Sequence, residues 1–232
     1  MFLPDFPLCS YYEENTLEEG INVVFLSEGN VSEKLFYKTL FCKGGKFADI
    51  DGYNFKEMKK TDFDVGITEP VLLVKKGKEK FESDPNIDIS RDKLVVTFDL
   101  DKLTEKDIEK LIDEKTNYLI YGFTNPKFEL VQLISAKAPI KGLEKSYYKA
   151  GFPNELLEDA YSVVAGKNSK GKPGAKFAAK NVCNILANFD YDSNDIRIED
   201  KFFSSVPMIL RAINEKKLQD FKQDFKKKGG KP

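Results

Sequence analysis

The sequence contains no histidine and only three cysteines among its 232 residues. Without histidine, Ser-His-Asp triads, histidine general bases, HNH-type nuclease sites and histidine-ligated zinc are excluded. Cys9, Cys42 and Cys183 are far apart and odd in number, so they predict neither a zinc ribbon nor a disulfide framework. This cysteine usage is typical of a reducing compartment, and we expect a cytoplasmic protein. Acid–base chemistry, if the chain performs any, falls to carboxylates, lysine or tyrosine.

Long apolar runs and a strong net charge are also absent. No segment approaches the ~20 apolar residues of a membrane-spanning helix, and no signal peptide is recognisable, so we expect no membrane association. The formal net charge is −1, so nucleic-acid binding would have to use local patches. Hydrophobic residues make up 41% of the chain, which is enough for one core and a small appendage.

An apolar run near the middle of the chain ends in two aspartates. Residues 94–98 are rich in β-branched side chains and predict a buried strand. Asp99 and Asp101 follow at its exit, where like charges raise each other's pKa and burial adds to the cost of ionisation. A cation such as Mg²⁺ removes this cost, because hard cations bind carboxylate oxygens. The pair indicates half of a metal site, or the paired carboxylates of a phosphoryl-transfer enzyme.

Strands and helices alternate along the first 140 residues. Besides 94–98, strands are expected at 21–26, 47–50, 71–74 and 117–123. Helices are expected after capping patterns that begin at Asn30, Thr104 and Thr124. Such alternation favours an α/β fold, in which a mainly parallel sheet is flanked by helices on both faces.

After Pro139 the pattern changes to helices only. Candidate helices are 154–164, 175–187 and 205–225. We therefore divide the chain into an α/β domain with an N-terminal arm (1–140), a C-terminal helical region (141–225) and a basic tail (226–232).

Polar residues gather where the expected strands end. Glu28 follows the first strand, Asp99 and Asp101 follow the middle one, and Glu129 lies one helical turn past Thr124-Asn125. Ligands bind beyond the carboxyl ends of the strands in open parallel sheets. Adjacent strands lie about 4.8 Å apart, so carboxylates at neighbouring exits can share one or two cations.

Three segments resemble the motifs of a known family. Residues 25–29 (Phe-Leu-Ser-Glu-Gly), with Glu33 and Tyr37 after them, resemble the EG-x-x-(S/T)E-x-x-(F/Y) opening of Toprim-type domains. Phe98-Asp99-Leu100-Asp101 is similar to their D-x-D element. Residues 124–131 (Thr-Asn-Pro-Lys-Phe-Glu-Leu-Val) resemble S-N-P-x-F-E-L-W, the third motif of the RloB-like phage-defence proteins. The motifs occur in the family's order and cover residues 21–136.

This resemblance implies a Toprim-like domain with a metal-dependent nuclease site that acts on DNA or RNA in abortive infection. Glu28 would be a general acid/base or a metal ligand, and Asp99 and Asp101 would be catalytic ligands of Mg²⁺ or Mn²⁺. Glu129 would be a further ligand. The family also implies an ATPase partner, and a second copy of this chain is another candidate partner.

The chain departs from the family in its third motif, where Val131 replaces the usual Trp and Ser135-Ala136 replaces a common His-Phe. A role of that histidine cannot be carried over. Farther on, residues 166–172 fit G-x-x-x-x-G-K, but Pro173 stands where a phosphate loop needs Ser or Thr. This basic loop is a candidate nucleic-acid contact or a solvated linker. Its lysines are Lys167, Lys170, Lys172 and Lys176.

Two other functions stay open. A haloacid-dehalogenase-type phosphatase would use Asp99 as nucleophile and Asp101 as general acid, although Lys102-Leu103 replaces the usual Gly-Thr pair. A non-catalytic Toprim-like module would sense a phage component or regulate an ATPase partner. The missing Trp and His of the third motif leave room for that function.

Overall fold

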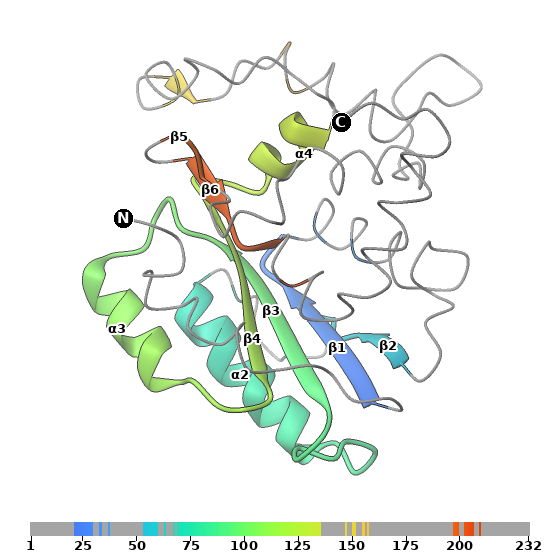
Figure 1. The fold of residues 1–232 in the computed structure, drawn as a ribbon. Coiled ribbons are helices and arrows are strands. Elements are labelled where there is room, and N and C mark those ends of the chain that lie inside the picture. Colours follow the sequence, from blue (N-terminus) through green and yellow to red (C-terminus); the bar gives the residue numbers. More distant parts are fainter. Residues whose placement is uncertain are drawn as a thin grey trace, which may run out of the picture.

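A computed structural model describes residues 21–29, 53–59, 69–135, 197–199 and 202–206, together with residues 33, 37, 63, 67, 147, 150, 151, 155, 157 and 209. These residues contain a six-stranded sheet of order β2-β1-β3-β4-β6-β5 (Figure 1). The strands are β1 (Ile21–Ser27), β2 (Tyr53–Glu57), β3 (Lys93–Asp99), β4 (Leu119–Asn125), β5 (Arg197–Glu199) and β6 (Phe202–Ser204). The first four run parallel, and β6 is antiparallel to both β4 and β5. The expected α/β fold is confirmed.

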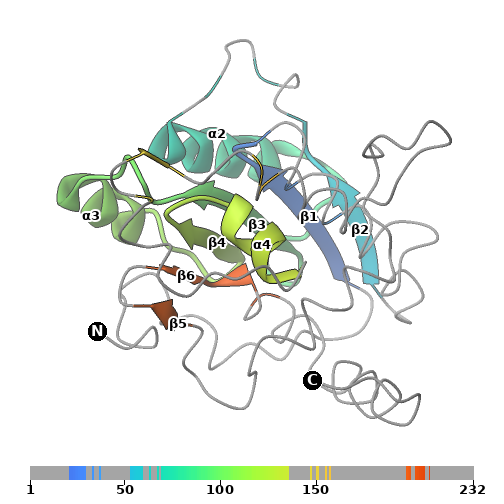
Figure 2. The same cartoon turned by 90° about the horizontal axis from the view of Figure 1, so that it is seen from above.

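Helices cover both faces of the sheet. On one face lie α2 (Pro70–Ser83) and α3 (Glu105–Asp113), side by side in Figure 2. A Cβ at Gly77 of α2 would lie 2.6 Å from Leu26, so this helix packs directly on β1. On the opposite face the helical residues Tyr37 and Ile209 approach Gly122 of β4. Among the described residues, helical positions therefore lie against both faces of the sheet.

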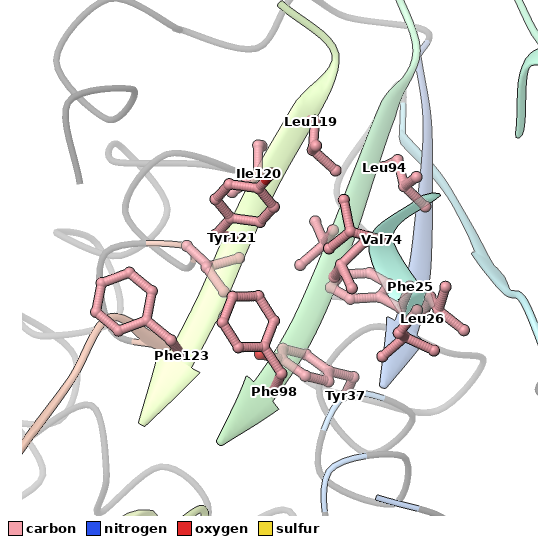
Figure 3. Packing of buried hydrophobic residues seen from close by; sticks show 14 of the residues in the cluster. Phe25, Leu26, Tyr37, Val74, Leu94, Phe98, Leu119, Ile120, Tyr121 and Phe123 are labelled. Atoms are coloured by element: carbon pink, nitrogen blue, oxygen red, sulfur yellow. The ribbon is translucent and has the colours of Figure 1, made fainter. Parts of the chain in front are cut away.

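The central strands are buried on both faces, which explains their nearly continuous apolar sequences. In β3, residues Leu94, Val95, Val96 and Phe98 are fully buried. Figure 3 shows Phe25 of β1 beside Tyr37, and their rings stack with centroids 4.7 Å apart. Tyr37, whose motif position left its role open, is thus a core residue, with 3% of its surface exposed.

The prediction of a strand at 71–74 is wrong, because these residues form the first turn of α2. Pro70 occupies the first helical turn, where its missing N–H costs nothing. Val71, Val74 and Phe81 are buried, whereas Leu72 is 38% exposed, which is the pattern of a helix with one buried face. A four-residue apolar run cannot distinguish a buried strand from a helix turn.

Two further corrections concern strands. The sequence predicted no strand at Tyr53–Glu57, yet β2 pairs in parallel with β1 there. The expected helix start at Thr124 is also wrong, since Thr124 and Asn125 continue β4 by pairing with Ser204 and Phe203. The next helix, α4 (Glu129–Ser135), begins after a cis Asn125–Pro126 peptide bond. The expected strand at 47–50 lies outside the described residues.

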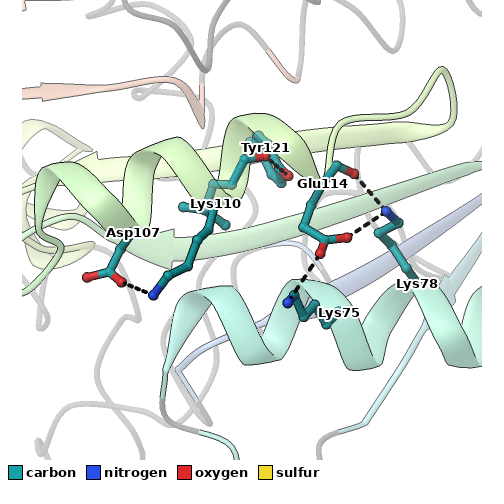
Figure 4. A network of polar contacts seen from close by, with 7 residues as sticks. Lys75, Lys78, Asp107, Lys110, Glu114 and Tyr121 are labelled. Carbon is teal, nitrogen blue, oxygen red and sulfur yellow. Dashed lines mark hydrogen bonds and ion pairs between the residues drawn. The ribbon is translucent and has the colours of Figure 1, made fainter.

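The capping pattern at Thr104 is confirmed as the start of α3. Asp107 N donates to the Thr104 side chain, and the Asp107 carboxylate accepts from Thr104 N, so the capping box is complete. Figure 4 shows how α3 joins its neighbours, with Glu114 after its last turn accepting from Lys78 of α2 (2.7 Å). The Tyr121 hydroxyl of β4 donates to Leu111 O (2.7 Å). In the part of the chain that the structure describes, no helix is both long and apolar enough to cross a membrane.

The expectation of helices only after residue 139 is wrong for residues 197–199 and 202–204, which form β5 and β6. Ser205 fixes this segment to β4, because its Oγ accepts from Phe123 N (2.8 Å) and its N donates to Phe123 O (2.8 Å). The hydroxyls of Thr124 and Ser204 add a buried contact at 2.9 Å. Val206 and Ile209 are helical, as expected for a helix beginning at 205.

Candidate acidic site at the carboxyl ends of the strands

The predicted acidic residues lie at one edge of the sheet, where β1, β3 and β4 end. Ser27 pairs with Thr97 and Asp99 pairs with Thr124, so the register brings the three strand ends together. Glu28 is the residue after β1, and Asp99 is the last residue of β3. Glu129 opens α4, four residues beyond β4. The sequence argument placed these three carboxylates at this edge, and the structure does the same.

Glu28 is held against the end of β3 by two hydrogen bonds. Its backbone N donates to Thr97 O (2.8 Å), which continues the β1–β3 ladder by one residue. Its carboxylate Oε2 accepts from Asp99 N (3.0 Å). Glu28 therefore has a defined orientation beside Asp99.

Among the acidic residues at this edge, Asp99 has the pKa that is shifted most. Burial raises the pKa of Asp99 to about 8, and repulsion from the carboxylates of Glu33, Glu129 and Glu28 adds to the rise. One hydrogen bond works against it, since Phe128 N donates to Asp99 Oδ1 (2.9 Å). We call these four residues, Glu28, Glu33, Asp99 and Glu129, the acidic cluster.

Glu33 belongs to this cluster although the sequence argument used it only as a capping and motif residue. It is buried, with 6% of its surface exposed, and its Oε1 accepts from Gly29 N (3.1 Å). Burial raises the pKa of Glu33, and repulsion from Glu129 and Glu28 contributes. The signal that could have identified it is the second glutamate of the EG-x-x-(S/T)E pattern. The capping partner expected for it, Asn30, lies outside the described residues.

Beneath the cluster, Thr97 and Tyr37 form a polar contact inside the core. Thr97 Oγ1 donates to the Tyr37 hydroxyl (3.1 Å), and burial raises the pKa of Tyr37 above its ordinary range. Gly122 provides the space for this contact, since a Cβ there would lie 3.0 Å from Thr97 Oγ1. The floor of the site is therefore tightly packed at this point.

Asp101, the fourth predicted ligand, has a different partner. Its Oδ2 lies 3.4 Å from Lys127 Nζ, and its side chain is 19% exposed. Residues 100 and 101 lie beyond the end of β3, in a bend and turn. The two-residue alternation of a strand therefore no longer aligns Asp101 with Asp99.

The donor chemistry of the acidic cluster is of the kind that a hard divalent cation prefers, because every donor is a carboxylate oxygen and the carboxylates repel one another. The carboxylates lie less close together than the shared cation site predicted from the sequence requires. Among the described residues, no three His, Cys, Asp or Glu side chains converge closely enough to hold a metal ion together. The candidate nucleic-acid lysines, Lys167, Lys170, Lys172 and Lys176, lie outside the described residues.

Comparison with known proteins gives no relative, since no protein-family model, no curated protein and no solved structure matches this chain.

Proposed function

We propose that the chain is a metal-dependent, Toprim-type phosphodiesterase that cleaves DNA or RNA as an effector of antiphage defence. The observation that carries this proposal is the acidic cluster at the carboxyl edge of a parallel sheet, in which the pKa of Asp99 is raised to about 8. Buried carboxylates with strongly shifted pKa values are concentrated at functional sites. The substrate class and the defence role come from the motif resemblance.

Three residues of the cluster have a part in this function. Glu28, oriented by Asp99 N, would take or give a proton or bind the cation, and Asp99 would bind it. Glu129 would contribute a further oxygen. A bound Mg²⁺ or Mn²⁺ would neutralise these carboxylates and stabilise the negative charge that develops on a phosphodiester during hydrolysis.

The test is cleavage of labelled DNA and RNA by the purified chain, with Mg²⁺, with Mn²⁺ and with a chelator. We expect cleavage only with a divalent cation, and a loss of at least about 100-fold in Glu28→Gln and in Asp99→Asn. Glu109→Gln is the matched control, because it removes the same charge from an exposed position on α3. Undiminished cleavage by both site variants would refute the proposal.

A non-catalytic regulatory module is the second candidate, and the pairing of Asp101 with Lys127 favours it. Such a module would bind a cation or a partner without cleaving any substrate. It predicts that Mn²⁺ raises the melting temperature by mass action while every nucleic acid stays intact. The phosphatase alternative predicts a phosphoaspartate trapped at Asp99.

A further inference from the structure

Glu33 is the residue of the acidic cluster that has no part in the proposed function. It is buried, with 6% of its surface exposed, and its Oε1 accepts from Gly29 N (3.1 Å). A Cβ at position 29 would lie 1.8 Å from Glu33 Oε2 and 2.2 Å from Oε1, so the carboxylate lies directly against the glycine backbone. The contact has room only because residue 29 is a glycine.

This contact restrains the residue before Gly29, which is Glu28. Glu28 N donates to Thr97 O (2.8 Å). The next amide along the chain, Gly29 N, is the one that donates to Glu33. Both peptide groups that flank the Glu28 Cα atom are thereby held, which restricts its two backbone dihedral angles. The direction of the Cα–Cβ bond follows from these angles, and the Glu28 carboxylate reaches Asp99 N, 3.0 Å from Oε2.

We infer that Glu33 is a positioning residue, which holds Gly29 N and thereby fixes the direction of the Glu28 carboxylate. It acts through the backbone and needs no contact with a substrate or a cation. Positioning requires only an oxygen that accepts from Gly29 N, whereas a direct chemical role would require the charge of Glu33. The inference goes beyond the proposed function and rests on it only where cleavage is measured.

The first test is amide hydrogen exchange, followed by NMR on the metal-free chain, and it needs no activity. In Glu33→Ala, exchange at Asp99 N should be about 10-fold faster than in the wild type, because Glu28 no longer holds its orientation as acceptor. Glu33→Gln keeps a side-chain oxygen that can accept from Gly29 N, so its exchange should match the wild type.

Gly29→Ala tests the same contact without removing Glu33, because the added Cβ has to displace the carboxylate. It should accelerate exchange at Asp99 N as much as Glu33→Ala does, and the double variant should be no faster. Leu100 N, which donates to Thr124 O, is the control amide and should be unaffected. The inference is overturned by unchanged exchange at Asp99, by equal acceleration at Leu100, or by equal effects of Glu33→Gln and Glu33→Ala.

Cleavage of labelled nucleic acid gives a second measurement. Glu33→Ala and Gly29→Ala should lower kcat by about 10- to 100-fold with little change in KM, and Glu33→Gln should retain most of the rate. Glu109→Ala, at an exposed position on α3, is the matched control. A loss in Glu33→Gln equal to that in Glu33→Ala would overturn the inference and leave the proposed function intact. Absence of cleavage by the wild type would refute the proposed function alone, because hydrogen exchange still decides whether Glu33 positions Glu28.

Discussion

Asp99 binds its proton more tightly in the folded protein than in the unfolded chain. Its pKa is raised from 3.8 to about 8 by burial and by the carboxylates of Glu33, Glu129 and Glu28. Between these two values the folded state holds a proton that the unfolded state has released. The stability that this group contributes is complete below about pH 4 and decreases as the pH rises towards 8.

We therefore expect Asp99→Asn to become increasingly favourable as the pH rises. Asparagine stays neutral, and its side-chain oxygen can still accept from Phe128 N. The variant should gain about 2 kcal/mol on the wild type between about pH 5.5 and pH 7.5. Urea denaturation of both proteins with a chelator present measures the difference. A difference that does not vary with pH would show that Asp99 is ionised throughout.

The residues that sequence reasoning placed correctly are those fixed by strand order. Glu28 and Asp99 end neighbouring parallel strands, so their proximity follows from the topology. Asp101 lies past the end of β3, where local backbone bending decides its direction, so its role as a ligand stays a prediction. Glu33 was not assigned to the site, although the second glutamate of the EG-x-x-(S/T)E pattern was a signal for it; only its burial and its hydrogen bond from Gly29 N bring it to the acidic cluster.

Among the helices and strands, short-range capping patterns predicted the structure correctly, whereas short apolar runs did not. The capping box of α3 involves residues three apart, so Thr104 and Asp107 alone specify it. The run at 71–74 fits a strand as well as a helix. In the structure it belongs to α2, where Val71, Val74 and Phe81 are buried on the same helix. The polar strand β2 lacks the continuous apolar sequence that identified β1 and β3.

Gly122 of β4 packs closely against the elements that cover the sheet. A Cβ there would lie 2.5 Å from Ile209 Cδ1 and 3.2 Å from the Tyr37 hydroxyl. We expect Gly122→Ala to lower the free energy of unfolding by about 1–3 kcal/mol through overpacking. Urea denaturation provides the measurement.

A second-site variant identifies the cause of that loss. Ile209→Val removes the methyl group nearest to the added Cβ, so it should restore part of the stability of Gly122→Ala. If Gly122→Ala is as stable as the wild type, the close packing described for this position is wrong.

For the whole molecule, the parallel part of the sheet was predictable and its antiparallel edge was not. The alternation of strands and helices predicted β1, β3 and β4. In sequence β4 is the next strand after β3, and β2 lies between β1 and β3. The strands β5 and β6 have three residues each, too few for a periodic signal. They depend on contacts such as that between Thr124 and Ser204, 80 positions apart.

Ser205 links the two distant parts of the chain, so its removal should destabilise the molecule as a unit. Ser205→Ala removes the hydroxyl that accepts from the buried Phe123 N, and we expect a loss of about 1–3 kcal/mol in the free energy of unfolding. Ser90→Ala, which alters an exposed hydroxyl, is the control. Hydrogen exchange of β3 and β4 should accelerate only in Ser205→Ala. Loss of protection confined to residues 197–206 would mean that this segment unfolds separately.

The antiparallel pairing of β4 with β6 also determines when this edge of the sheet can fold during synthesis. Thr124 and Asn125, next to the acidic cluster, acquire their neighbours only when residues 203 and 204 are available. A ribosome therefore has to translate 80 residues beyond Thr124 before this edge can assemble. A nascent chain carries the acidic residues early, yet it can complete their surroundings only after residue 204 has been added.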